Sequence, residues 1–126
     1  MRDEIDAGAE FLRAFDHYRP VKAAFWLKAS EESQRYLYIA SDQIDDTNFD
    51  VAYGEVLRVA HQMGSIYLEA SQVKVINAER PLARAALEVN QCFPGRMGTR
   101  LGGRMFGDIS IDSAYIYPSP LPAAVV

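Results

Sequence analysis

The residues of this chain that are best suited to chemistry are three arginines that stand among glycines. In residues 95–108, five of fourteen positions are glycine, and Arg96, Arg100 and Arg104 are interleaved with them. Glycine allows close approach of the backbone and positive φ angles, and a guanidinium group presents paired donors to phosphate or carboxylate. This composition indicates an anion-binding loop.

Two other interpretations of the same stretch remain open. It matches neither the GxxxxGK[ST] fingerprint nor a GxGxxG between a strand and a helix, and a turn or glycine-rich hairpin has a similar composition. Alternatively, an enzyme for an anionic substrate would use the arginines as clamps, with Asp108, Asp112 or His61 as general acid or base. The plain connection is the simpler interpretation.

A second set of candidates is aromatic. Trp26, Tyr36 and Tyr38 fall in two segments whose alternation is typical of strands. On one exposed sheet face, these rings would form a platform for a protein partner or a stacked ligand. As cross-strand pairs they would instead be half-buried. The two arrangements stay open, because the register of the hairpin is not fixed by the sequence.

No motif for a cofactor or a metal centre is visible. Cys92 is the only cysteine, so we expect it to pack in the core rather than to form a disulfide or a zinc site. Asp42, Asp45 and Asp46 lie close together but lack the glycine and the glutamate of a calcium-binding EF-hand loop. Capping of the following helix explains them, and we expect neither a cofactor nor a metal.

Charge and hydropathy disfavour two classes of partner. The formal net charge is −4, which disfavours non-specific binding to the negatively charged phosphates of nucleic acid. No apolar run approaches the roughly 20 residues that span a bilayer. Residues 1–10 carry several acids and lack the features of a secretory signal. We therefore expect a cytoplasmic protein that does not bind membranes. A nucleic-acid module that uses the arginines with the strand aromatics is a third interpretation, which the acidity of the chain disfavours.

The elements that must position the candidate residues follow from the hydrophobic periodicity. In chain order, the pattern predicts a helix over 4–19, strands over 21–30 and 35–41, a helix over 47–63, a strand over 72–77, a helix over 81–93 and one or two strands within 109–117. Pro20 ends the first helix, Gly64 caps the second and Pro81 opens the third.

Together these elements predict an α+β fold of order α-β-β-α-β-α-β(-β). We expect a mainly antiparallel sheet of four to five strands with all three helices packed on one face. A chain of this length supports one core, so residues 1–117 should form a single domain. Residues 118–126, with three prolines, should form an extended, disordered tail.

The sequence alone does not identify the function. The best interpretation is a small non-catalytic protein-binding module that self-associates as a homodimer, because an uncovered aromatic sheet face on so small a domain would need covering. The alternative is a small enzyme or binding protein for an anionic or phosphorylated ligand, which would use residues 95–108.

Overall fold

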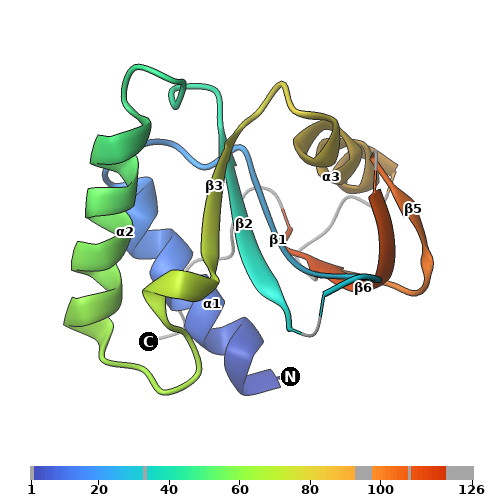
Figure 1. The fold of residues 1–126 in the computed structure, drawn as a ribbon, viewed down its shortest axis with the longest axis horizontal. Coiled ribbons are helices and arrows are strands. Elements are labelled where there is room, and N and C mark those ends of the chain that lie inside the picture. The colour runs from blue at the N-terminus through green and yellow to red at the C-terminus, as the bar shows by residue number, and fades with distance from the viewer. Residues whose placement is uncertain (1, 33, 93–97, 108, 119–126) are drawn as a thin grey trace.

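The computed structural model describes residues 2–32, 34–92, 98–107 and 109–118, and it confirms an α+β fold with the predicted order of elements (Figure 1). The elements are α1 (Arg2–Asp16), β1 (Ala23–Ala29), β2 (Tyr36–Ser41), α2 (Phe49–Met63), a 3-10 turn η1 (Ala70–Gln72), β3 (Val73–Asn77), α3 (Pro81–Cys92), β4 (Thr99–Leu101), β5 (Arg104–Phe106) and β6 (Ile109–Ile116). None of the helices among the described residues is long and apolar enough to cross a membrane.

The strands form one six-stranded sheet of order β3-β2-β1-β6-β4, with β5 also paired to β6. The sheet is mainly antiparallel, as predicted, but it is mixed rather than purely antiparallel, because β2 and β3 run parallel. Their connection contains α2, the crossover that a parallel pair requires. The glycine-rich stretch contributes two strands of three residues each, too short for their alternation to be recognised in the sequence.

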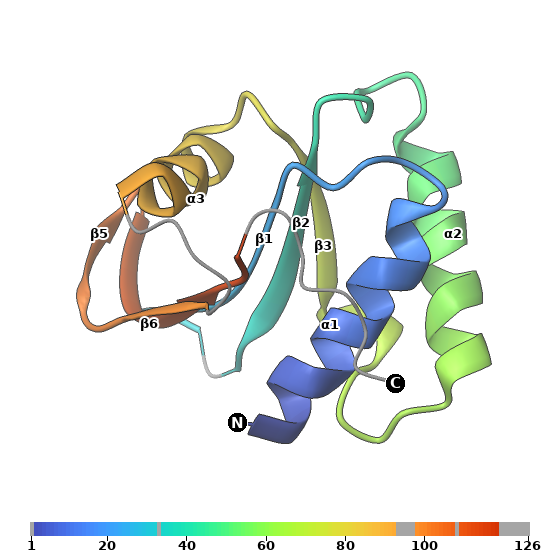
Figure 2. The same ribbon diagram turned by 180° about the vertical axis from the view of Figure 1, so that it is seen from behind.

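The prediction that all helices share one sheet face is wrong. Helices α1 and α2 cover one face and α3 covers the other, as the two opposite views show (Figures 1 and 2). The cause is that β1 carries apolar side chains on both faces of the sheet. Trp26 faces α1 and α2, whereas Phe25 and Leu27 face α3, and all three are buried. A sheet that is apolar on both faces needs cover on both.

The turn before α2 explains the acidic loop. Asp45 accepts hydrogen bonds from the backbone N–H and the hydroxyl of Thr47, and Asn48 accepts one from the backbone N–H of Asp45 at 2.9 Å. These bonds hold the chain in a tight turn, so α2 begins at Phe49, two residues later than predicted. The predicted end is confirmed, since Gly64 has a φ of 57° and its N–H caps the helix.

A buried chain of hydrogen bonds attaches α1 to the sheet. The indole Nε1 of Trp26 donates to the hydroxyl of Tyr117 at 3.0 Å, and this hydroxyl donates to the carbonyl oxygen of Ile5 at 2.6 Å. Burial raises the pKa of the Tyr117 phenol well above its ordinary value. Gly8 makes room for the ring, because a Cβ there would lie 2.2 Å from the hydroxyl.

The predicted division into a domain over 1–117 and a tail over 118–126 stays a prediction, because residues 119–126 lie outside the described residues.

We expect Tyr117→Phe to lower the free energy of unfolding by about 1–3 kcal/mol, because it leaves two polar groups without their partner. Urea denaturation followed by circular dichroism measures this change. Tyr67→Phe, at an exposed tyrosine, is the control and should change stability by less than about 0.5 kcal/mol. Equal stability of the two variants would show that the hydrogen-bond chain contributes nothing.

Candidate functional site

The register of three neighbouring strands builds the floor of the site. Phe25 on β1 pairs with Tyr38 on β2, and Tyr38 pairs with Lys74 on β3, so the three side chains form one row across the sheet. This row lies on the face that α3 covers. However, α3 packs mainly against β1 and β6. The β2 and β3 end of the row is therefore left without a helix above it.

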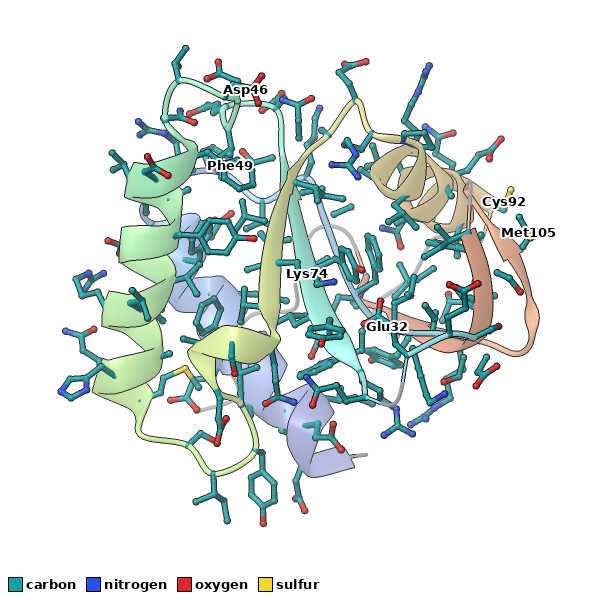
Figure 3. All side chains as sticks on the ribbon, in the orientation of Figure 1. Glu32, Asp46, Phe49, Lys74, Cys92 and Met105 are labelled. Carbon is teal, nitrogen blue, oxygen red and sulfur yellow. The ribbon has the colours of Figure 1, made fainter. Side chains whose placement is uncertain are left out.

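Lys74 lies above this uncovered end of the sheet (Figure 3). Its Nζ is 4.1 Å from the centroid of the Tyr36 ring and 5.6 Å from that of Tyr38, which is cation–π geometry with the nearer ring. The Tyr38 ring in turn stacks on Phe25 with centroids 5.2 Å apart and planes within 6°. The ammonium group is thus held over a rigid aromatic floor, with 39% of the side chain exposed.

A groove of about 800 Å³ opens over this floor. Its base includes Tyr38, Lys74 and Ile76. Glu32 in the turn after β1 and Arg80 just before α3 also line it. A groove of this size that combines apolar surface with a few fixed polar groups is the usual form of a site for a small molecule.

The charges in the groove are only loosely paired. The Nζ of Lys74 and the Oε1 of Glu32 are 4.0 Å apart, and both side chains are about one-third exposed (Figure 3). An exposed ion pair of this length stabilises a protein by only ~0–1 kcal/mol. Another anion could therefore replace the Glu32 carboxylate beside Lys74 at little cost.

The Tyr38 phenol responds to the same charges. Burial raises its pKa above the ordinary value, the positive charge of Lys74 acts in the opposite direction, and the negative charge of Glu32 raises it further. Tyr38 therefore stays protonated at neutral pH.

The predicted aromatic platform is wrong in one of its three members. Trp26 has no exposed surface and lies under α1 on the opposite face from Tyr36 and Tyr38. The reason is the register, since Trp26 pairs with Leu37, one residue out of phase with both tyrosines. Tyr38 is itself only 6% exposed. Tyr38 thus lies in the floor of a groove, with Tyr36 beside it under Lys74, rather than on an exposed platform.

Of the three predicted arginines, the structure describes the side chain of only one. Arg96 lies outside the described residues, and Arg104 belongs to β5 but its side chain is not described. Arg100, on β4, places its guanidinium carbon 5.5 Å from the centroid of the Tyr115 ring. The structure therefore tests the predicted arginine cluster only at Arg100.

Arg100 shares a hollow of about 290 Å³ with Arg35, Ser113 and Tyr115 on the sheet face opposite the groove. We call it the arginine hollow. A Cβ at Gly98 would lie 2.2 Å from the Tyr115 ring, so this glycine permits the ring to lie against the backbone. Arg35 is 3.9 Å from Glu4, again a long pair, and both side chains are partly buried. Two guanidinium groups thus line one small hollow.

Of the proposed acids and bases, neither Asp112 nor His61 lines either site. Asp112 pairs with Lys28 at 2.6 Å, and this hydrogen bond lowers the pKa of its carboxyl group. His61 lies on α2, and Asp108 is outside the described residues.

The prediction that Cys92 packs in the core is wrong, since it is exposed. Within the described ranges, no three His, Cys, Asp or Glu side chains converge in a way that could hold a metal.

Comparison with known proteins gives no further guidance. No protein-family model, curated protein or solved structure matches the chain.

If the groove charges act on Tyr38 as described, two substitutions should move its pKa in opposite directions. Lys74→Met removes the positive charge and should raise the pKa, whereas Glu32→Gln removes the negative charge and should lower it. NMR titration of ¹³C-labelled tyrosine measures both, with Tyr38→Phe to assign the signal. Shifts of the same sign in the two variants would contradict the groove geometry.

Proposed function

We propose that the protein is a non-catalytic binding module whose groove takes a small organic anion with an apolar or aromatic body. The observation that carries this proposal is the position of Lys74, whose ammonium group is held over Tyr36 at the base of an 800 Å³ groove. A fixed cation beside apolar surface recognises the two parts of such a ligand at once.

The case for an anionic group rests on what surrounds Lys74. Its carboxylate partner Glu32 is 4.0 Å away and partly exposed, so a ligand carboxylate can take that place. Arg80, which also lines the groove, offers a second cation. A closer, charge-assisted hydrogen bond from Lys74 to a ligand would be stronger than the pair it replaces.

The case for an apolar body rests on the walls. Ile76 and Leu82 are buried core residues that nevertheless line the groove, and Ile109 lines it from β6. The Tyr38 ring adds a flat surface. Covering such surface contributes about 25 cal/mol per Å² of apolar area. An inorganic anion would leave this part of the groove unused.

We expect 2-naphthoate, as a fluorescent probe of this class, to bind the wild-type protein and to bind Lys74→Met about tenfold more weakly or worse, because the charge-assisted bond is lost. Methionine keeps an apolar stem over Tyr36, so the fold should be retained. Glu32→Gln should tighten binding about two- to fivefold, since the competing carboxylate is removed. Fluorescence titration measures all three affinities.

The uncharged analogue 2-naphthamide is the matched ligand control, and its affinity should be the same for the wild type and both variants. If Lys74→Met binds naphthoate as well as the wild type does, the groove is not the anion site.

A second candidate function is the binding of a compact anion in the arginine hollow. The observation that favours it is that Arg35 and Arg100 line one hollow beside Ser113, and that none of its described lining residues is acidic, although Glu4 lies 3.9 Å from Arg35. Guanidinium groups suit phosphate because their donors are paired and planar. This second candidate function keeps the anion-binding role that the sequence predicts for Arg100. Arg35 takes the place of the other two predicted residues, Arg96 and Arg104.

Titration with inorganic phosphate separates the two candidates. If the arginine hollow is a site, phosphate should shift the backbone amide signals of β4 and β6, and Arg100→Gln and Arg35→Gln should each weaken the binding about tenfold. Lys74→Met should leave it unchanged. Shifts spread evenly over surface lysines and arginines would exclude a specific site there.

A further inference from the structure

The groove is lined by charges of both signs. Among its described lining residues, Glu31 and Glu32 follow β1, Lys74 lies on β3 and Arg80 precedes α3. The two acids balance the two bases, so these four residues together carry no net charge. The charges of a binding site complement those of its ligand. The balance therefore favours a ligand that carries a positive group as well as a negative one.

Lys74 and Glu32 bring the opposite charges to one place. They come from different elements, and their side chains lie close together (Figure 3). The Nζ of Lys74 and the Oε1 of Glu32 are 4.0 Å apart, which is longer than the roughly 2.7–2.9 Å of a direct charge-assisted hydrogen bond. Both side chains are about one-third exposed. One ligand can therefore contact this cation and this anion at the same time.

Glu32 matters most when a ligand is bound. A ligand carboxylate beside Lys74, as the proposed function requires, lies within a few ångströms of the Glu32 carboxylate, and like charges at this distance repel. An ammonium group next to the ligand carboxylate turns this repulsion into attraction. The charges then alternate from Lys74 through the ligand carboxylate and the ligand ammonium to Glu32. An α-amino acid carries both of these groups on one carbon atom.

The apolar lining defines the rest of such a ligand. The Tyr38 ring lies beside Lys74, with its centroid 5.6 Å from Nζ. Ile76 and Leu82 belong to the same apolar cluster as Tyr38, and all three line the groove. A side chain that extends from an α-carbon beside Lys74 can therefore cover aromatic and aliphatic surface. This lining favours an aromatic or large aliphatic side chain over a small or charged one.

From these observations we propose that the groove binds a free α-amino acid with an aromatic or large apolar side chain. Its carboxylate binds Lys74 and its ammonium group binds Glu32. The inference rests on the proposed function, because it places an anionic group at the same lysine. It adds a site for a cation, which a simple organic anion does not use.

Two ligands with the same naphthyl body test the cation site. We expect 3-(2-naphthyl)-L-alanine to bind the wild-type protein about fivefold more tightly than 3-(2-naphthyl)propanoate, because only the amino acid has an ammonium group for Glu32. N-acetylation removes the positive charge and keeps the carboxylate, so the N-acetyl derivative should bind as the propanoate does. Fluorescence titration measures all three affinities. An N-acetyl derivative that binds as tightly as the free amino acid would overturn the inference.

Glu32→Gln gives the sharpest test, because its effect should differ in sign between the two ligands. It should weaken the binding of naphthylalanine about fivefold, since the partner of the ammonium group is lost. It should tighten the binding of naphthylpropanoate about two- to fivefold, since a like charge is removed. Glu79→Gln makes the same charge change at an exposed residue outside the groove lining, and it should alter neither affinity. Effects of the same sign on both ligands would contradict the inference.

Lys74→Met separates failure of this inference from failure of the proposed function. The variant should weaken the binding of both ligands about tenfold, because both place a carboxylate at Lys74. If naphthylpropanoate binds the variant as well as the wild type, the proposed function fails, and the inference fails with it. If naphthylpropanoate depends on Lys74 but naphthylalanine is not weakened by Glu32→Gln, only the inference fails.

Discussion

The hydrogen-bonded chain from Trp26 through Tyr117 to Ile5 determines which face of the sheet packs against α1. A buried indole N–H needs a partner, and the Tyr117 hydroxyl supplies it only where β1, the end of β6 and α1 meet. Since side chains alternate along a strand, placing Trp26 under α1 places Phe25 on the other face. Through the strand register, Tyr38 and Lys74 follow it there. The groove is thus a consequence of the core on the opposite side.

The groove also depends on α3 covering only part of its face. The turn between β5 and β6 holds the start of α3 at one end of the sheet. Gly107 has a φ of 61°, and a Cβ there would lie 3.0 Å from backbone atoms of Pro81 and Leu82. This contact requires glycine, both for the backbone conformation and for the space. With α3 held against β1 and β6, the β2 and β3 end stays open.

The helices and strands could be predicted from the sequence because their boundaries depend on residues that are close together in the chain. Pro81 at the start of α3 and Gly64 at the end of α2 act through their own backbone geometry, and both are confirmed. The prediction that all helices share one face was wrong because β1 is apolar on both of its faces. Residues 23–27 form a continuous apolar run, which indicates a strand that is buried on both sides. Burial at Phe25 and Trp26 alike shows that both faces needed cover.

The sites were harder to predict because they join residues that are distant in the chain. The sequence does mark Lys74 as unusual, because it is a single charged residue between two valines in a short strand. Its contact with Tyr36 depends on the parallel pairing of β2 and β3, which no local pattern indicates. Arg35 joins Arg100 only across the sheet.

The central claim is that Lys74 is held over the tyrosines of an open groove, and NMR of the side chain measures this most directly. If the claim is correct, the ε-methylene protons of Lys74 will show nuclear Overhauser contacts to the Tyr36 ring. They will also show an upfield ring-current shift that disappears in Tyr36→Leu. Random-coil shifts for these protons, without contacts to either tyrosine, would contradict it.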